Sequence, residues 1–342
     1  MLANDKKTPL VFTGNAREYF GIWIVNLLLS ILTQGIYSAW AKVRRKKYFY
    51  QHTLIDGVGF DYHASPIGIL KGRLIAFAFF ALYAVSGSIS PILSALLGLV
   101  FIFFLPWIVV RSMLFNARNS SHRGLRFDFT GTTGEAARVF IFLPMLVPFT
   151  LGLIYPYISR RRATFLMSSH RYGTSQFQVD VKVADFYLEY LKALLIMLVV
   201  AVASSFIATV LLGGLLGKPD GIPMGVPFVA SLLLAVLMAA AFLQARLGNV
   251  LWNGTRLDSL GFHANLKARY LAWLYISNML AIVCSFGLLT PWAQVRAVRY
   301  HAQCIALTDE VDFERFVGEK RTALKATGDE VAEMFDVDLA FG

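Results

Sequence analysis

Long uncharged stretches dominate the chain, and most are long enough to cross a bilayer, which takes roughly 20 apolar residues per helix. The longest, residues 74–110, is interrupted by Ser86-Gly87-Ser88-Ile89-Ser90-Pro91, so it is expected to cross twice. The pattern predicts seven membrane segments, at residues 19–41, 74–110 (two segments), 139–159, 193–217, 221–245 and 270–295. Apolar sequence begins late and no small-residue cleavage site follows it, so we expect the first segment to be retained.

Internal repeats accompany these segments. The sequence Phe12-Thr13-Gly14 recurs 117 residues later as Phe129-Thr130-Gly131. Gly35, Gly152 and Gly287 are each followed by an aromatic residue five positions later and an arginine nine positions later. We interpret this as duplication of one unit. The predicted copies cover residues 12–65, 129–180 and, partially, 262–308, with Gly35, Gly152 and Gly287 as their hinges.

A second pattern places an arginine, a polar residue and a phenylalanine at separations of nine and seven residues. It occurs four times, as Arg44-Thr53-Phe60, Arg111-Ser120-Phe127, Arg161-His170-Phe177 and Arg246-Thr255-Phe262. Within the first copy, Asp56-Gly57 lies between two short runs with strand character, which predicts a tight β-hairpin turn. We therefore expect small β-hairpins on the polar face, packed together through the phenylalanines.

Charge decides the orientation and leaves one question open. Positive residues collect on the cytoplasmic side of membrane proteins. If all seven segments cross, the 32 Lys and Arg divide 13 against 19 between the two sides. If segments 19–41, 139–159 and 270–295 instead re-enter, every Lys and Arg except Lys218 lies on one side. Gly and Pro interrupt these three segments, which fits re-entry, but kinked spanning helices remain the alternative.

Composition supports a membrane protein with a separate tail. The chain is 57% hydrophobic and 15% charged, with a net charge of +11, whereas soluble domains carry about 25% charged residues. The predicted fold is an all-α polytopic membrane protein of about seven segments, with short β-hairpins on the cytoplasmic face. Residues 1–308 form the membrane domain. Residues 309–342, with ten acids against four bases, form an acidic cytoplasmic tail that folds against the basic face or docks a protein partner or second copy.

Signs of catalysis are missing. The sequence contains no P-loop, nucleophile elbow, dinucleotide fingerprint or zinc-type cysteine pair, and the six histidines form no ligand pattern. Cys284 and Cys304 are expected to be free thiols. We therefore expect no enzyme activity, cofactor or metal. The basic residues flank membrane segments, which favours contact with anionic lipid headgroups over nucleic acid.

The candidate site residues are polar groups at or near the membrane boundary. Arg44, Arg111, Arg161 and Arg246 each follow an apolar stretch, where arginines commonly anchor to headgroups. The alternative is a ring of guanidinium groups that holds lipid phosphates or an anionic solute. Asn26 and Asn278 lie inside repeat segments, where they either bridge helices through hydrogen bonds or line a solute path.

The first repeat carries a family resemblance. Its sequences Glu18-Tyr19-Phe20-Gly21-Ile22-Trp23, Gly35-Ile36-Tyr37-Ser38-Ala39-Trp40-Ala41-Lys42-Val43-Arg44 and Tyr48-Phe49 resemble the signature of the YjgN-like family, bacterial inner-membrane proteins with a domain of unknown function. The match is closest over residues 12–73, and the weak third repeat departs from it. The resemblance implies a multi-pass inner-membrane protein and supplies no activity.

Two classes of function follow from these observations. Repeated broken segments and the four arginines favour a passive channel or transporter of small, anionic solutes. The absence of charged residues within the apolar segments weighs against an ion-coupled pump and favours the alternative, a non-catalytic scaffold that binds anionic lipids or partner proteins.

Overall fold

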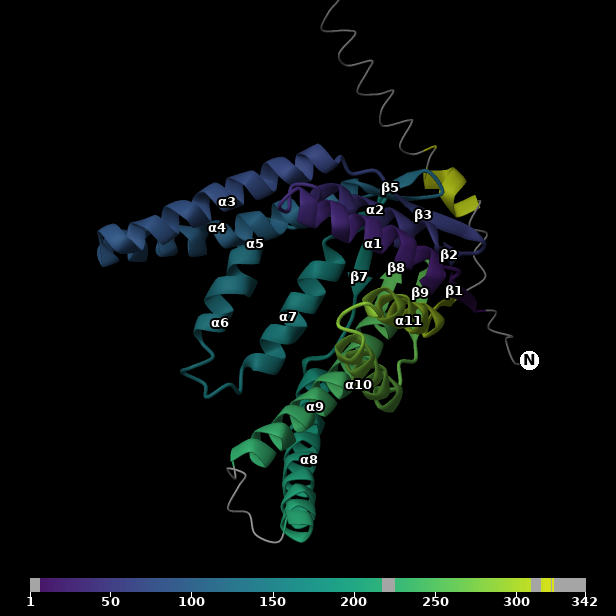
Figure 1. Ribbon diagram of the computed structural model, residues 1–342. Helices are drawn as coiled ribbons and strands as arrows, with labels where there is room; N and C mark the ends of the chain where they lie inside the picture. The colour runs from purple at the N-terminus through teal and green to yellow at the C-terminus, as the bar shows by residue number, and fades with distance from the viewer. Residues whose placement is uncertain (1–6, 217–224, 309–314, 321, 323–342) are drawn as a thin grey trace, which may run out of the picture.

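The chain is organised around a closed barrel of ten short strands (Figure 1). The computed structural model describes residues 7–216, 225–308, 315–320 and 322. Every strand pairs antiparallel with both neighbours, and β1 closes the barrel against β10. The strands are β1 (Thr8–Phe12), β2 (Thr53–Ile55), β3 (Val58–Tyr62), β4 (Ser120–His122), β5 (Leu125–Phe129), β6 (His170–Tyr172), β7 (Ser175–Val179), β8 (Thr255–Leu257), β9 (Leu260–Ala264) and β10 (Ile305–Thr308).

Helices are inserted after every odd-numbered strand, so the described chain consists of five strand–helical hairpin–strand units. In the third unit the first arm is divided into two α-helices and a π-helical segment, η1. The helices are α1 (Ala16–Leu32), α2 (Ser38–Gln51), α3 (Pro66–Ile89), α4 (Pro91–Arg118), α5 (Thr133–Ala137), η1 (Arg138–Phe142), α6 (Leu143–Met145), α7 (Tyr155–Ser168), α8 (Val183–Leu216), α9 (Gly225–Asn253), α10 (Ala268–Cys284) and α11 (Thr290–Gln303).

Two-residue turns join consecutive units at one end of the barrel. At Asp56-Gly57 both residues have positive φ, 49° and 73°, as do Arg123-Gly124 at 47° and 78°. This geometry matches the twist of a two-residue β-hairpin, and the first of these turns lies where the sequence predicted it. Because the strands alternate in direction, all five helical hairpins must leave from the opposite end. We call these the turn end and the helix end of the barrel.

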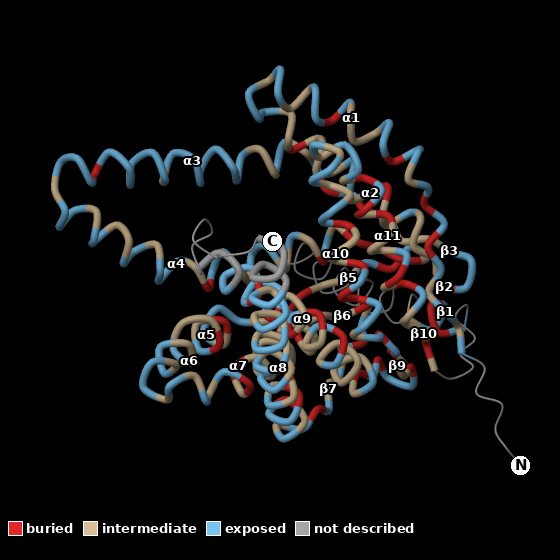
Figure 2. Tube along the Cα trace, turned by 60° about the horizontal axis from the view of Figure 1, so that its bottom comes forward, coloured by how far each residue is buried: buried red, intermediate tan, exposed pale blue. Residues whose placement is uncertain are grey.

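Two of the five helical hairpins are long. The four helices α3, α4, α8 and α9 contain stretches long and apolar enough to cross a membrane: Pro66–Ile89, Pro91–Arg118, Val183–Val210 and Phe228–Asn253. They project from the barrel, and most of the α3–α4 surface is exposed (Figure 2). Their exposed residues are mainly large and apolar, as expected where lipid replaces water.

The other three hairpins are short, and here the expected seven-segment bundle is wrong. Each segment reverses at a residue pair with positive φ, namely Gln34-Gly35, Leu151-Gly152 and Phe286-Gly287. The longest arms, α1 and α10, have 17 residues and rise only about 25 Å, less than the roughly 30 Å bilayer core. The first arm of each hairpin starts at the helix end of the barrel, and the second arm returns to that same end.

The predicted all-α class is therefore corrected by the ten-stranded barrel. The predicted hairpins exist, but they are not separate elements on a helical surface, because each pairs with the hairpins on both sides. Strands of only three to five residues cannot satisfy their backbone groups in isolation. Closing the barrel gives every strand two partners and removes its exposed edges.

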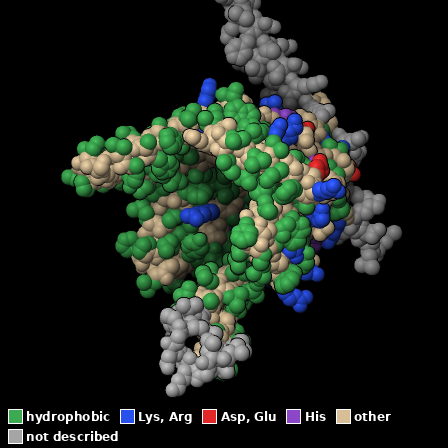
Figure 3. Space-filling view, viewed as in Figure 1, with side chains coloured by type: hydrophobic (Ala, Val, Ile, Leu, Met, Phe, Trp, Pro, Cys, Tyr) green, Lys and Arg blue, Asp and Glu red, His purple; other side chains and the backbone are tan. Residues whose placement is uncertain are grey.

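Charge and apolar surface are separated in space. Apolar side chains cover the projecting helices, whereas Lys, Arg, Asp and Glu gather mainly over the barrel side (Figure 3). The loop between α3 and α4, around Ser90 and Pro91, carries no charge. Lys218, the positive residue expected on the opposite side, lies outside the described residues.

The barrel interior is apolar and layered. Directly paired residues point to the same face of the sheet, and this places the pairs Leu10–Ile55, Phe60–His122, Phe127–Tyr172, Phe177–Leu257 and Phe262–Leu307 in one layer. All except His122 belong to one hydrophobic cluster or pack against it. The first strand of each unit thus supplies one large apolar side chain to this layer. We call these five residues, Leu10, Phe60, Phe127, Phe177 and Phe262, the collar.

Candidate functional site

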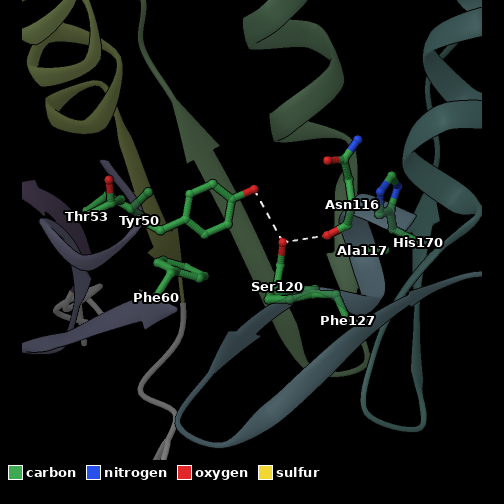
Figure 4. A pocket seen from close by; sticks show the side chains of 9 residues that line it. Tyr50, Thr53, Phe60, Asn116, Ala117, Ser120, Phe127 and His170 are labelled. Carbon is green, nitrogen blue, oxygen red and sulfur yellow. Dashed lines mark hydrogen bonds between the residues drawn. The ribbon is translucent and has the colours of Figure 1, made fainter. Parts of the chain in front are cut away.

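A cavity of about 350 Å³ opens at the helix end of the barrel, above part of the collar (Figure 4). Its residues come from the first three units. They are Leu10, Tyr50, Thr53, Phe60, Asn116, Ala117, Ser120, Phe127 and His170. No acidic residue is among these lining residues. The cavity therefore joins an apolar floor, formed by the collar, to a rim of hydroxyl, amide and imidazole groups.

The rim residues are positioned by the helix–strand junctions. Thr53, Ser120 and His170 are the first residues of β2, β4 and β6. Each bonds to the backbone carbonyl oxygen four residues earlier, at 2.8 Å for Thr53 Oγ1, 2.7 Å for Ser120 Oγ and 2.6 Å for His170 Nδ1. Thr255 makes the same bond at 2.7 Å in the fourth unit. The last carbonyls of a helix lack intrahelical partners, so these side chains cap the second helix in four of the five units.

Capping leaves some groups directed to the cavity. In neutral His170, the nitrogen that donates to Leu166 is Nδ1, which leaves Nε2 as an acceptor. The Tyr50 hydroxyl lies 3.4 Å from Ser120 Oγ, which itself donates to the Asn116 carbonyl (Figure 4). The rim can therefore both donate and accept hydrogen bonds.

The collar narrows the barrel below the cavity. The Phe60 and Phe127 rings stack with centroids 6.2 Å apart, and the Phe177 and Phe262 centroids are 6.0 Å apart. All five collar residues, Leu10 included, are only half-buried, although the barrel surrounds them. Eight-stranded barrels are just wide enough to be filled by side chains, so a ten-stranded barrel has a wider interior for the collar to fill.

The turn end is closed by residues near the C-terminus. Phe316 and Val317 are buried in the barrel cluster, and the Phe316 ring stacks on Tyr172 with centroids 6.3 Å apart. Lys320 Nζ forms a 2.7 Å ion pair with Asp258 at the turn between β8 and β9. This segment, residues 315–320, belongs to the predicted acidic tail. The remaining tail residues, apart from 322, lie outside the described part of the chain.

Burial lowers the pKa of two basic groups near the cavity. Burial lowers the pKa of His122 to about 4, so its imidazole is neutral at pH 7. Burial, reinforced by Lys42 and Arg45, lowers the pKa of Lys46 to about 8. Lys46 Nζ donates a 2.6 Å hydrogen bond to Asn116 Oδ1, so a partly desolvated ammonium stands behind the cavity rim.

The Asp258 carboxyl, which forms the ion pair with Lys320 of the tail, stays charged despite its partial burial. Burial alone would raise its pKa. Hydrogen bonds from Lys320 and Ser175 outweigh that effect and hold the pKa of Asp258 below its ordinary value. The carboxylate is therefore charged at neutral pH, and the ion pair with Lys320 is present.

The four predicted arginines are distributed over the helical hairpins. Arg44, Arg111, Arg161 and Arg246 lie on α2, α4, α7 and α9, the second arms of four different units. Arg246 binds Glu189 of α8 at 3.2 Å and borders a separate cavity of about 630 Å³ that also holds Asp180 and Asp185. Arg44 lines a groove beside Glu18. Each precedes the first residue of the next strand by nine positions, so all four occupy the same place in their units.

The predicted hinges and asparagines belong to the short hairpins. Gly35, Gly152 and Gly287 have φ of 92°, 83° and 89° at the three chain reversals, a conformation that glycine adopts without strain. Asn26 and Asn278 are both buried, on α1 and α10. None of these residues reaches the cavity at the helix end of the barrel.

Sequence reasoning did not identify this cavity, although five of its nine lining residues follow the spaced pattern. Thr53, Ser120 and His170 occur in the spaced pattern, but the pattern was interpreted as hairpin packing. Tyr50 and Asn116 carried no signal at all. Their shared property is position: they lie in the last turn or turns of the helix that precedes a capped strand. In the described residues, no group of three or more His, Cys, Asp or Glu could hold a metal ion.

Comparison with known proteins gives a consistent family. A family model described as a bacterial protein of unknown function, DUF898, matches residues 7–334. The inner membrane protein YjgN of Escherichia coli O157:H7 is 30% identical over 156 residues, 44% of this chain and 39% of the relative, and the strain K12 protein gives the same values. The Salmonella typhimurium LT2 protein of that name is 23% identical over 354 positions, with 89% of each chain covered. No solved structure matches the chain.

These matches confirm the resemblance recognised in the first repeat. The aligned region spans only about two fifths of the Escherichia coli relatives, so their names carry no activity over. The relatives are named inner membrane proteins, and this chain has four apolar helices of spanning length. It is accordingly a membrane protein.

Proposed function

Since the chain belongs to the DUF898 family of bacterial proteins of unknown function, we propose a role from the barrel itself: passive, gated passage of a small solute along the barrel axis. One observation carries the proposal. A cavity of about 350 Å³ leads into a closed ten-stranded barrel, and the apolar side chains of the collar, Phe316 and Val317 form one cluster in the barrel interior. The proposed passage is non-catalytic.

This cluster has the chemistry of a hydrophobic gate. The collar is apolar and half-buried, and apolar constrictions close water-filled paths by dewetting. Phe316 and Val317 form a second closure at the turn end. In this proposal, solute enters at the helix end, and movement of the 315–320 segment opens the turn end.

The solute class follows from the lining. Hydroxyl, amide and imidazole groups surround the cavity without a lining carboxylate, and the Lys46 ammonium stands behind Asn116. This favours small neutral or anionic solutes over cations. We place the protein in a bacterial inner membrane as a multi-pass protein. Its barrel and C-terminus would then be cytoplasmic, because positive residues favour that side.

Enlarging the collar tests the proposal. In proteoliposomes loaded with a small anion such as chloride, Phe60→Ala combined with Phe127→Ala should accelerate efflux. Phe103→Ala, which removes the same ring from the exposed surface of α4, is the matched control and should leave efflux at the wild-type rate. If the double variant folds but its chloride efflux is no faster than that of the control, conduction through the barrel is excluded.

A second candidate is a scaffold that binds anionic lipids. The observation in its favour is that Arg44 and Arg111 are exposed, and neither has an acidic partner within ion-pair distance among the described residues. Arg111 also lies over the Trp107 ring at 5.7 Å, a pairing suited to a membrane interface. Collar variants that show no faster efflux than wild type but still retain anionic lipid would favour this candidate.

A further inference from the structure

A second cavity, of about 440 Å³, lies between α1, α2 and the beginning of α3. Three basic side chains line it, Lys42 and Arg45 from α2 and Arg73 from α3. No lining residue is acidic, and none of the three basic groups has an ion-pair partner among the described residues. Arg73 donates a hydrogen bond to the Ser38 hydroxyl. The cavity thus concentrates positive charge without internal compensation.

The cavity also contains a buried polar atom without a partner. Asn26 is 7% exposed, lines the cavity and leaves its Oδ1 without a hydrogen bond. A buried acceptor without a donor destabilises the folded state. The side chain is therefore expected to receive a donor from whatever fills the cavity.

The fifth unit provides an internal comparison. Asn278 is equivalent to Asn26, since each precedes its hinge glycine by nine residues, and it is 8% exposed. Its Oδ1 accepts a hydrogen bond from Arg296 Nη1 at 3.2 Å, and its Nδ2 donates to the Ala293 carbonyl at 3.2 Å. The same asparagine is therefore satisfied from within its hairpin in one unit and not in the other.

The reason lies in the equivalent arginine. Arg44 occupies the position of Arg296, nine residues after the hinge glycine. It is directed to the groove beside Glu18 and His52 instead of to Asn26. In place of one arginine, the asparagine of the first hairpin lies in a cavity with three other basic residues, two from α2 and one from α3.

The position along α3 places this cavity at the level of the headgroups. Arg73 is the last charged residue before the uncharged stretch 74–110, and α3 is one of the four helices of spanning length. Trp23 and Leu27 form an apolar part of the wall. A ligand here would meet cations on one side and hydrocarbon on the other.

We propose that this cavity binds a phosphate group that carries a hydroxyl-bearing substituent, such as the headgroup of an anionic glycerophospholipid. Lys42, Arg45 and Arg73 bind the phosphate oxygens, and a ligand hydroxyl donates to Asn26 Oδ1. Inorganic phosphate shares the anionic chemistry and the hydroxyl donor. The site is separate from the barrel cavity and from the four arginines that the sequence singled out.

The test uses the full chain in nanodiscs that contain phosphatidylglycerol and phosphatidylcholine, with retained lipid counted by native mass spectrometry after transfer to detergent. The triple variant Lys42→Gln, Arg45→Gln, Arg73→Gln should lose retained phosphatidylglycerol by at least about tenfold, given roughly 1 kcal/mol per basic residue at an anionic surface. The control Arg126→Gln, Lys182→Gln, Arg256→Gln removes the same charge from exposed positions at the barrel and should retain it. Equal retention by the two variants would overturn the proposal.

Two further arms separate the ligand source and the role of the asparagine. Displacement of phosphatidylglycerol by millimolar inorganic phosphate would identify a free-phosphate site, whereas resistance to it would identify a lipid site. Asn26→Leu should weaken retention without lowering thermal stability, because it removes an unsatisfied acceptor. Asn278→Leu should lower stability and leave retention unchanged. The reverse pattern for the two asparagines would contradict the assignment.

Discussion

At the scale of single residues, the end of each odd-numbered strand shows a balance of side-chain sizes. The last strand residue and the residue two positions later are both buried in most units. Where the last strand residue is large, the residue two positions later is small. Where the last strand residue is small, the later one is large. The pairs are Phe12–Gly14, Tyr62–Ala64, Phe129–Gly131, Val179–Val181 and Ala264–Leu266. The recurring Phe-Thr-Gly sequence is thus the extreme case, in which the ring lies over the glycine.

Exchanging the sizes within one pair tests this interpretation. A Cβ at Gly131 would lie 2.6 Å from the Phe129 ring, so Gly131→Leu should lower the free energy of unfolding by about 1–3 kcal/mol through overpacking. Phe129→Ala should cost about 3–5 kcal/mol. The double variant recreates the Ala264–Leu266 arrangement and should recover much of the loss in thermal unfolding. Additive losses in the double variant would refute the size balance.

At the scale of elements, the long helices α8 and α9 are joined by a buried carboxylate. Glu189 is 5% exposed and accepts hydrogen bonds from Arg246 Nη2 at 3.2 Å and Lys192 Nζ at 3.1 Å. A buried charge is tolerated only when it is paired. The predicted solute contact Arg246 therefore has a structural task in holding one long hairpin together.

Breaking this contact should loosen the hairpin. Arg246→Met leaves Glu189 with Lys192 alone, and we expect a loss of about 1–2 kcal/mol, below the 3–5 kcal/mol of a fully buried pair because Arg246 is half exposed. Glu189→Leu combined with Arg246→Met should restore stability, since no buried charge then remains. Thermal unfolding of the purified variants measures both effects. A single variant as stable as wild type would mean that the contact does not stabilise the helix pair.

At the scale of the whole molecule, barrel closure fixes the sidedness of the chain. All the β-turns lie at one end and all the helical hairpins leave from the other, so no hairpin can carry the next turn across the membrane. The arrangement favours re-entry for residues 19–41, 139–159 and 270–295 over kinked spanning helices. It also explains how a chain with so many positive residues could keep them on one side.

Single cysteines test this sidedness. In a background with Cys284→Ser and Cys304→Ser, the exposed sites Asp61→Cys, Arg126→Cys, Thr174→Cys and Ser259→Cys should all react with an impermeant maleimide from the same side of the membrane. Ser88→Cys, near the tip of the α3–α4 hairpin, should react from the opposite side. Labelling of the four barrel sites from different sides would exclude a closed barrel outside the membrane.

About half of the residues that line the cavity follow a pattern in the sequence, but the sequence did not predict a cavity. Thr53, Ser120, His170 and the collar phenylalanines follow a regular spacing because each unit repeats one helix–strand junction. Their convergence on a cavity was hidden, since it depends on units separated by dozens of residues lying side by side. The four arginines recur at one position of the repeated unit, and the fold places them on four different helices. Their roles, as headgroup anchors or as anion ligands, stay predictions.

The sequence by itself determined what depends on neighbouring residues. Runs of apolar residues predicted the long helices, and Asp56-Gly57 predicted a β-turn. Gly35, Gly152 and Gly287 marked the points where the short hairpins reverse with positive φ. Only the tertiary structure decided the closed barrel, the cavity above the collar, the Glu189–Arg246 contact and the different surroundings of Asn26 and Asn278. The physical reason is that strands of three to five residues are stable only through partners distant in the chain, and local patterns do not specify those partners.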